Sequence, residues 1–480
     1  MRVMVWFRTD LRTRDHAALF EAARVATRGV VGVFVVSPGE WRAHEWAGAK
    51  VAFTLRGVAA LRSSLEKLNI PLRIVRSETP GEIPDVLAGL ARETACDALY
   101  ATIEHEVNER RRDAMVKSSF ERAGVRTAWF EGQTLVTPGS VRTGAGTPYT
   151  VFTPFKRSLL ARWEAEGWPL MSGLPRQQEA MVCTPSPVPK VEEGFDSSVP
   201  AKLWPGGEDE ARRRLGAFLS DRVGNYDTAR DRPDVEGTSA LSPYLALGMI
   251  SPRECVAAAH RAVPRGSESI PTGVATWISE VIWREFYLHV LAAFPRVCMG
   301  RAFDVSTERV AWREDPAGLE AWQEGRTGVP IVDAGMRQLR ATGWMHNRVR
   351  MITASFLTKN LLIDWRRGES WFMRNLVDGF FASNNGGWQW CASTGTDAAP
   401  YFRVFNPVNQ GKRFDPDGTY VRRWVPELAA FDASVIHEPW TLLPLTRAGV
   451  EYPEPIVDLS TSRVRAIEAF RTAREGGGSR

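Results

Sequence analysis

Residues 343–407 mix aromatic side chains with polar and charged ones that an ordinary protein core would exclude. Trp344, Trp365, Trp388 and Trp390 recur there among arginine, asparagine and aspartate residues. Aromatic walls with a few fixed polar groups are typical of a site for a planar ligand. The stretch therefore predicts a binding site for a large planar molecule.

One helical segment and one turn carry the polar groups of this stretch. Asn347, Arg350 and Met351 fall on adjacent turns of one helix, so an amide, a guanidinium and a thioether come close together. We expect Arg350 to pair with Asp378, and such a pair would stabilise negative charge that develops on a ligand. The tryptophans are equally explained as core packing, since spacing alone does not indicate electron transfer.

A second segment, TWISEVIWREFYLHV, places a carboxylate beside indole rings. Trp277, Glu280, Arg284 and Tyr287 recur at helical spacing and share roughly one face, with Trp283 at its edge. Indoles on both sides of Glu280 would remove its hydration and raise its pKa, which makes it a candidate proton donor. A plain Glu280–Arg284 ion pair on a core helix explains the same spacing, and both interpretations stay open here.

Hydroxyl groups precede the next apolar helical run. Thr238, Ser239 and Ser242 can present hydroxyl and backbone N–H groups to an anion such as a diphosphate, or can simply cap the helix. The chain has no Walker P-loop, zincin motif, GxSxG elbow or Rossmann GxGxxG in the required context. The common phosphate-binding and hydrolase mechanisms are therefore disfavoured.

Residues 1–132 have the pattern of a parallel α/β domain. Short β-branched runs alternate with helical patterns such as 50–68 and 108–123. We predict a five-stranded parallel sheet with helices on both faces, and its strands at residues 3–7, 30–36, 72–75, 99–103 and 125–130.

The composition and periodicity of the chain change twice after residue 132. Residues 133–205 are predicted to be an interdomain linker, because prolines scatter among Ser, Glu and Gly from about residue 171. Helical patterns then dominate, so residues 206–470 are predicted to form an all-α domain. The Gly-rich end, residues 471–480, is predicted to be a flexible tail.

Bulk properties set wide limits on function. A chain of 480 residues favours two domains, and a net charge of +5 permits a nucleic-acid partner without requiring one. The five cysteines lack CxxC spacing, which indicates a reducing compartment and no zinc or other metal site. No apolar run approaches the roughly 20 residues of a membrane helix, so we expect a cytoplasmic protein.

From VWFRTDLR near the N-terminus to FRVFNP and HEPW near the C-terminus, the chain resembles the DNA photolyase and cryptochrome family. Within it, the class I photolyases that act on cyclobutane pyrimidine dimers are the most similar group. The resemblance implies that light excites fully reduced flavin adenine dinucleotide (FAD), which passes an electron to a dimer flipped out of UV-damaged DNA. The cyclobutane ring then splits and the electron returns.

The resemblance also assigns roles to residues. It implies FAD binding by Tyr226, Thr238, Ser239, Ala240, Leu241, Ser242, Trp277, Arg284, Arg350, Asp378, Gly379, Phe380 and Asn384. It implies DNA or lesion contacts by Glu280, Trp283, Tyr287, Asn347, Arg348, Met351, Trp390 and Arg403. Of these residues, Glu280, Asn347, Arg350 and Met351 form the implied catalytic group, in which Glu280 would hydrogen-bond the pyrimidine carbonyl. Trp388, Trp365 and Trp312 match the family's electron-transfer chain, which reverses the core-packing interpretation.

Two details of the resemblance are specific to this chain. His44, Asn108, Glu109 and Cys298 match positions that bind a 5,10-methenyltetrahydrofolate antenna, but Met299 stands where similar relatives carry lysine. The family usually has Asp at both ends of the 378–380 turn, and Phe380 departs from this pattern. Comparing flavin occupancy between wild type and Phe380→Asp tests whether that side chain matters.

Three other functions compete with dimer repair. A cryptochrome-like photoreceptor shares the fold, but Asn384 stands where plant-type receptors carry Asp, and no long C-terminal extension follows. A photolyase for 6-4 photoproducts would have two histidines in place of Asn347 and Met351. A bare DNA-binding module would not explain the aromatic site. The expected partner is UV-damaged DNA, and we expect a monomer with no obligate protein partner.

Overall fold

The computed structural model describes residues 1–167, 169–171, 173–174, 181–263, 269–447 and 449–475. Its contacts divide the chain into two compact units. Unit 1 comprises Met1–Gly224, Ser239–Cys298 and Val377–Phe380, and unit 2 comprises Asn225–Thr238, Met299–Leu376 and Phe381–Arg480. The bounds predicted from sequence character, 1–132, 133–205 and 206–470, stay a prediction.

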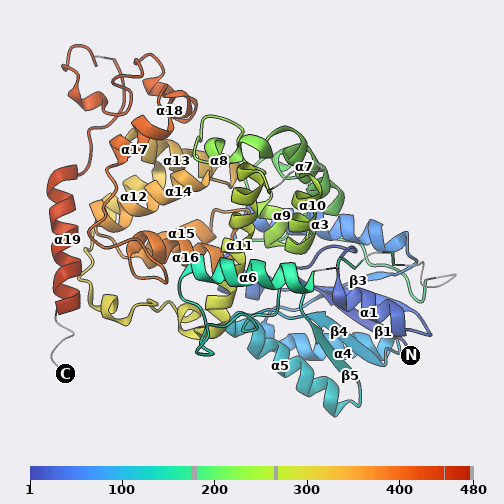
Figure 1. The fold of residues 1–480 in the computed structure, drawn as a ribbon. Helices are drawn as coiled ribbons and strands as arrows, with labels where there is room; N and C mark the ends of the chain where they lie inside the picture. The colour runs from blue at the N-terminus through green and yellow to red at the C-terminus, as the bar shows by residue number, and fades with distance from the viewer. Residues whose placement is uncertain (168, 172, 175–180, 264–268, 448, 476–480) are drawn as a thin grey trace. The chain divides into compact units, whose positions relative to one another are not determined.

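Unit 1 contains a five-stranded parallel sheet in the order β3-β2-β1-β4-β5 (Figure 1). The strands are β1 (Val3–Phe7), β2 (Val30–Val36), β3 (Leu72–Arg76), β4 (Ala98–Thr102) and β5 (Arg126–Phe130). This confirms the predicted sheet, with each strand end within one residue of its expected position. Buried β-branched runs made these strands predictable, because a parallel sheet is covered on both faces.

Helices cover both faces of this sheet, as predicted. Trp6 packs in one cluster with Leu87 of α4 (Ile83–Glu93) and Phe120 of α5 (Val107–Arg122). On the other face, a Cβ at Gly32 would lie 3.2 Å from Phe7 and 3.3 Å from Leu65 of α3 (Gly48–Glu66), so glycine leaves room for this helix to pack. The remaining helices of unit 1 are α1 (Ala17–Val25), α2 (Pro38–Ala43), α6 (Phe152–Glu166), α7 (Glu208–Asp221), α9 (Ser242–Ala246), α10 (Pro252–Arg261) and α11 (Thr272–Ala293).

Part of the predicted linker is helical. Helix α6 lies within residues 133–205, and its buried Phe155 packs edge-on against Phe286 of α11 with ring centroids 5.3 Å apart. Residues 168, 172 and 175–180 of the same stretch lie outside the described residues. The apolar residues before the proline-rich segment therefore pack into unit 1.

The described part of unit 2 contains helices and no strand, which agrees with the predicted all-α class. Its core includes Trp322, Met345, Trp365 and Tyr420, each at most 1% exposed. Its α-helices are α8 (Tyr226–Ala229), α12 (Pro316–Glu324), α13 (Pro330–Thr342), α14 (Asn347–Ser355), α15 (Trp365–Met373), α16 (Phe381–Ala392), α17 (Pro407–Phe414), α18 (Thr419–Trp424) and α19 (Leu459–Glu475).

Helix α19, red in Figure 1, includes the first five residues of the predicted tail. Phe470 and Ala473 are buried in a cluster with Val310 and Leu362, which explains why the helix continues to Glu475. Residues 476–480 of the predicted tail lie outside the described residues.

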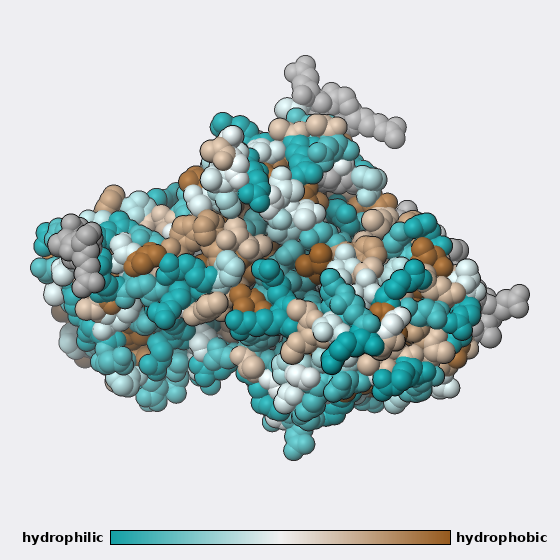
Figure 2. Space-filling view, turned by 90° about the horizontal axis from the view of Figure 1, so that it is seen from below, coloured by the Kyte–Doolittle hydropathy of each residue, from teal (hydrophilic) through white to brown (hydrophobic). Residues whose placement is uncertain are grey.

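The face drawn in Figure 2 is mainly hydrophilic, with hydrophobic side chains in small separate groups. Such scattered apolar residues are ordinary on a protein surface. Across the described ranges, no helix combines the length and apolar character that a membrane span needs.

Lys359 is a buried cation in unit 2 and gives a testable pH dependence. It is 1% exposed, and burial lowers its pKa from 10.5 to about 7. Between these values the unfolded chain holds one more proton than the folded chain, so raising the pH stabilises wild type by up to about 1.4 kcal/mol per pH unit. Lys359→Met removes this contribution, so the stability of the variant relative to wild type should fall as pH rises from 7 to 10. Urea unfolding at several pH values measures this difference, and a constant difference would contradict the expectation.

Candidate functional site

Helix α11 carries the indole and the carboxylate that the sequence singled out. Trp277 is 3% exposed, packs against Phe218 with ring centroids 5.3 Å apart, and its Nε1 donates to the Ser239 hydroxyl at 3.3 Å. Ser239 therefore lies beside Trp277 in unit 1, as expected for two residues of one site. Thr238 precedes it in unit 2, and Ser242 begins the short helix α9.

An aromatic wall extends along the same helix. The Trp283 ring stacks on Phe152 with centroids 3.7 Å apart and an interplanar angle of 7°. Tyr287 lies 5.6 Å from Trp283, ring centre to ring centre. Glu280 lies one turn before Trp283 and is half-buried. The rings restrict each other's movement, so this part of α11 offers a rigid apolar surface beside a carboxylate.

Arg284 does not form the ion pair with Glu280 that the spacing allowed. Its Nη1 donates to the Gln133 carbonyl at 2.6 Å and its Nη2 to the Leu245 carbonyl at 3.4 Å. Burial lowers the pKa of the Arg284 guanidinium from 12.5 to about 10. In the described part of the chain, Arg284 makes no ion pair, and its Nη donors bond the carbonyl groups of Gln133 and of Leu245 in α9 instead.

The structure accounts for the unusual Phe380. The Arg284 guanidinium lies 4.4 Å from the centre of the Phe380 ring, which is a cation–π contact. On the same turn, the Gly379 carbonyl accepts a hydrogen bond from Lys50 at 2.7 Å, and Asp378 is 6% exposed. The face of the Phe380 ring therefore contacts a buried cation of the same unit. The Arg350–Asp378 pair joins residues of different units and stays a prediction.

Helix α14 in unit 2 brings together the predicted amide and thioether. The Asn347 side-chain amide lies 4.0 Å from the Met351 sulfur, and Arg350 Nε donates to the Met345 carbonyl at 2.8 Å. His346 caps this helix, because its Nδ1 accepts from the Arg348 backbone N–H. Burial lowers the pKa of His346 to about 4, so it is a neutral structural residue.

Other predicted contacts of unit 2 are distributed over several elements. Arg348 donates to Asp231 at 2.8 Å and stacks on the ring of Phe414, with its guanidinium carbon 4.4 Å from the ring centre. Arg403 is exposed, Tyr226 is 7% exposed, and Trp390 is half-buried. The side-chain amide of Asn384 donates to the Glu369 carbonyl at 3.1 Å.

The three predicted electron carriers lie in the core of unit 2 or beside it. Trp388 is 2% exposed and Trp365 0% exposed, whereas Trp312 is half-buried against Phe470. A Cβ at Gly368 would lie 2.1 Å from the Trp388 ring, so this glycine makes room for the indole. Two of the three indoles are therefore enclosed by protein, and the third is partly exposed to solvent.

Three of the predicted antenna residues meet in unit 1. His44 Nδ1 lies 3.3 Å from Glu109, and His44 Nε2 lies 3.2 Å from the Asn108 amide. Glu40 approaches too, so that one ligand atom each from Glu40, His44 and Glu109 lies within 4.8 Å of the others. Burial and the nearby carboxylates raise the pKa of Glu109 well above its ordinary value. Cys298 belongs to the same unit and lies in the 3-10 helix Pro295–Met299.

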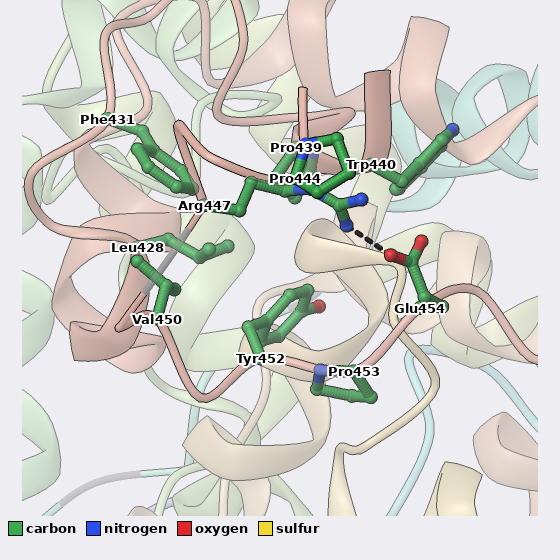
Figure 3. Close-up of a pocket in the computed structure, with 10 residues that line it drawn as sticks. All are labelled: Leu428, Phe431, Pro439, Trp440, Pro444, Arg447, Val450, Tyr452, Pro453 and Glu454. Atoms are coloured by element: carbon green, nitrogen blue, oxygen red, sulfur yellow. Dashed lines mark hydrogen bonds and ion pairs between the residues drawn. The ribbon is translucent and has the colours of Figure 1, made fainter. Parts of the chain in front are cut away.

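A separate cavity in unit 2 shares no residue with the predicted sites. It encloses about 230 Å³, and an Arg447–Glu454 ion pair crosses one side of it (Figure 3). This volume is below the roughly 300–1,000 Å³ of pockets for drug-sized ligands, so the cavity does not suit FAD. The lining residues are Leu428, Phe431, Pro439, Trp440, Pro444, Arg447, Val450, Tyr452, Pro453 and Glu454.

Comparison with known proteins identifies the family. Residues 277–472 match the model of the FAD binding domain of DNA photolyase, and residues 3–175 match the DNA photolyase model. A deoxyribodipyrimidine photo-lyase of Escherichia coli K12 is 41% identical over 477 residues, which cover 98% of this chain and 99% of that relative. This chain belongs to the DNA photolyase and cryptochrome family.

Solved structures of this photolyase family share the fold over the whole chain. A bacterial class III photolyase from Agrobacterium tumefaciens is 37% identical, with a TM-score of 0.86 over 99% of this chain and 98% of that one. A Synechocystis cryptochrome is 29% identical, with a TM-score of 0.85 over 98% of this chain and 99% of that one. The predicted combination of an α/β and an α-helical part is thereby confirmed.

Arg284 tests whether the residues of this photolyase family member fit FAD. Its Nε is buried and has no partner among the described residues, although buried N–H groups are normally satisfied. A guanidinium with an unused donor suits a ligand that carries anionic or carbonyl oxygens. The Ser239 hydroxyl and the buried Trp277 indole, in the same unit, add a polar and an aromatic contact. The residues present therefore fit FAD.

Sequence reasoning missed Lys50 and Asp231. Lys50 begins an amphipathic helical pattern and looks like a solvent-facing residue, yet it is 4% exposed and bonds a turn more than 300 positions away. Asp231 lies in the charged run RDRPD, where a solvated surface is the ordinary interpretation. Only a tertiary contact distinguishes these two residues from surface charges.

Proposed function

We propose that this chain is a deoxyribodipyrimidine photo-lyase that repairs cyclobutane pyrimidine dimers in UV-damaged DNA by a light-driven reaction. The observation that carries the proposal is its full-length similarity to enzymes of that name, 41% identical in Escherichia coli and 42% in Salmonella typhimurium. The stacked ring of Trp283 and half-buried Glu280 on α11 agree with this proposal.

When bound in its reduced form, FAD would supply the photoexcited electron that the lesion accepts. Arg284 has the donor to bind an oxygen of this cofactor, and Trp277 and Ser239 lie together in the same unit. Asn384 is held by the Glu369 carbonyl and keeps its amide oxygen available as an acceptor. The full proposed set is Tyr226, Thr238, Ser239, Ala240, Leu241, Ser242, Trp277, Arg284, Arg350, Asp378, Gly379, Phe380 and Asn384.

Glu280 has the central role at the lesion in this proposal. Its protonated carboxyl group donates a hydrogen bond to a pyrimidine carbonyl oxygen as negative charge develops there, which stabilises the charged pyrimidine. Asn347 and Met351 offer an amide and a thioether next to each other. Trp283 excludes water, because its ring is fixed by stacking on Phe152. Tyr287 and Trp390 complete the proposed lesion contacts.

Three tryptophans carry electrons to the cofactor when it is oxidised. Trp388 and Trp365 are enclosed, so an electron that reaches them is shielded from water, and half-buried Trp312 is accessible to external donors. Stacking of Arg366 on Trp365, 4.7 Å from guanidinium carbon to ring centre, disfavours a long-lived positive charge on that indole. The arrangement supports transfer inward from Trp312.

His44, Asn108, Glu109 and Cys298 are proposed to bind a 5,10-methenyltetrahydrofolate antenna. The contacts among the first three residues support a polar site for a heterocycle with several N–H groups. Chromophore extraction from the purified protein identifies the antenna, and recovery of a deazaflavin would contradict this assignment. We also propose that the protein acts as a cytoplasmic monomer without an obligate protein partner.

Arg348 and Arg403 are proposed to contact DNA phosphates. Arg348→Ala should weaken binding of dimer-containing DNA roughly tenfold and reduce the slope of log affinity against log salt by about 1, because one phosphate contact is lost. Fluorescence anisotropy at several salt concentrations measures both. Arg24→Ala, which removes an equal charge from an exposed ion pair in unit 1, is the control and should leave the slope unchanged. An unchanged slope for Arg348→Ala would contradict a phosphate contact.

Repair assays on oligonucleotides that carry either a cyclobutane dimer or a 6-4 photoproduct test the function directly. We expect light-dependent loss of the cyclobutane dimer alone when FAD is reduced. A cryptochrome-like photoreceptor is the second candidate, supported by the 0.85 TM-score to the Synechocystis cryptochrome. FAD binding without light-dependent repair would favour that candidate.

A further inference from the structure

The segment Val377–Phe380 clusters with unit 1, although the chain on both sides of it belongs to unit 2. Two cations of unit 1 hold this segment. Lys50, in the first turn of α3, donates from Nζ to the Gly379 carbonyl at 2.7 Å, and Arg284 of α11 lies 4.4 Å from the Phe380 ring centre. These two contacts give a physical reason for the assignment of the segment to unit 1.

Lys50 is enclosed to an unusual degree for a lysine. It is 4% exposed, and its ammonium nitrogen lies 3.6 Å from the centre of the Trp46 ring. Burial lowers its pKa from 10.5 to about 7, although Glu106, Glu109, Asp378 and Glu104 act in the opposite direction. An apolar side chain of similar length would avoid the free-energy cost of burying an ammonium group. The lysine at this position therefore destabilises the fold relative to such a side chain.

The hydrogen bond of Lys50 fixes backbone, not merely a side chain. Gly379 has no side chain through which packing could hold it, so the carbonyl bond restricts the orientation of its peptide group. The neighbouring side chains, Asp378 and Phe380, project from the same short segment. A shift of the Gly379 peptide would therefore move both of them.

We propose that Lys50 is a positioning residue for FAD, which acts from the α/β part of unit 1 by holding the Asp378-Gly379-Phe380 turn. This inference rests on the proposed function, in which that turn contacts FAD. Lys50 itself acts through the turn and need not touch the cofactor. Arg284 holds the other end of the turn through the Phe380 ring.

Lys359 provides a matched control for Lys50. It is 1% exposed, lies 3.6 Å from the ring centre of Phe470, and donates to the Ala392 carbonyl at 3.2 Å. Burial lowers its pKa to about 7, the same value as for Lys50. Replacing either lysine by methionine removes a buried cation, a cation–π contact and a hydrogen bond to a carbonyl, but only Lys50 holds the 378–380 turn.

The test compares FAD affinity and the flavin absorption spectrum of the full-length wild type, Lys50→Met, Lys50→Arg and Lys359→Met. We expect the dissociation constant for FAD to rise about tenfold or more in Lys50→Met, as for loss of a hydrogen bond to a charged group, with a shifted flavin band. Lys359→Met should stay within about twofold of wild type. Lys50→Arg keeps a charged donor and should restore most of the affinity.

Equal FAD affinities of Lys50→Met and Lys359→Met would overturn the positioning role, and so would a failure of Lys50→Arg to recover affinity. If Lys50→Met does not fold, Lys50→Gln replaces it in the test, because the glutamine side chain is too short to reach the Gly379 carbonyl. The expected result and the result that would overturn the positioning role stay the same. A wild type that binds no FAD would instead contradict the proposed function, so the two failures are distinguishable.

Discussion

Replacing Trp388 with phenylalanine is expected to slow light-driven reduction of oxidised FAD roughly 100-fold, which corresponds to about 2.7 kcal/mol of barrier. A phenyl ring fills most of the space but gives up an electron much less readily than an indole. Repair by protein whose FAD has been reduced chemically should stay close to wild type, because that reaction does not need the tryptophan chain. Absorbance under blue light with an external reductant measures the first rate, and dimer repair after dithionite treatment measures the second.

Trp322→Phe is the matched control for this prediction. Trp322 is 0% exposed, and its ring centre lies 6.0 Å from that of Trp388. Its Nε1 donates to the Thr353 carbonyl at 3.1 Å, so the substitution disturbs the same core and loses a buried hydrogen bond. We expect Trp322→Phe to lower stability without slowing photoreduction more than about threefold. Equal loss of photoreduction and repair in Trp388→Phe would indicate a packing role instead.

Trp388 also illustrates how far sequence alone can lead. Its spacing from Trp365 and Trp312 is irregular, so periodicity indicated only a buried aromatic residue. Trp388 is buried in the structure, and Gly368 leaves the space that its indole ring occupies. The role in electron transfer comes from the resemblance to a family and stays a prediction, because a buried indole in a core and one in a relay look alike.

The sheet was predictable because its signal is local. The run of residues 30–36, VVGVFVV, is short and rich in β-branched residues, which favours a strand that is covered on both faces. Helix α6 was not predicted, because a proline-rich stretch follows it closely and dominated the composition of residues 133–205. Local composition averages over both parts of such a segment.

Arg284 shows why the contacts of the site were harder to predict than its residues. Helical spacing correctly placed it one turn from Glu280, and this suggested an ion pair. In the structure its donors reach carbonyls of Gln133 and Leu245, and its face reaches Phe380. These partners are about 40 to 150 positions away in sequence, so no pattern within α11 could identify them.

Glu280→Ala is expected to reduce the repair yield per absorbed photon roughly tenfold, about the contribution of one hydrogen bond to a charged group. The carboxyl group is proposed to bond the pyrimidine carbonyl more strongly as charge develops, so its loss acts on the reaction more than on binding. FAD content and the midpoint of thermal unfolding should stay near wild type, because Glu280 is only half-buried and alanine preserves helix α11 around it. Single-turnover repair after a calibrated light dose measures the yield.

Glu285 on the same helix separates a chemical role from a structural one. It is 1% exposed and accepts from the backbone N–H groups of Leu135 and Val136 at 2.9 and 3.2 Å, with His289 at 3.2 Å. Glu285→Ala leaves these buried groups without a partner and should cost about 3 kcal/mol of folding free energy. The two variants should thus show opposite profiles, with Glu280→Ala stable but poor in repair and Glu285→Ala unstable but, where folded, active. A Glu280→Ala protein that repairs dimers at the wild-type yield would show that the reaction does not need this carboxyl group, and the stack of Trp283 of α11 on Phe152 of α6 would remain as the determinant.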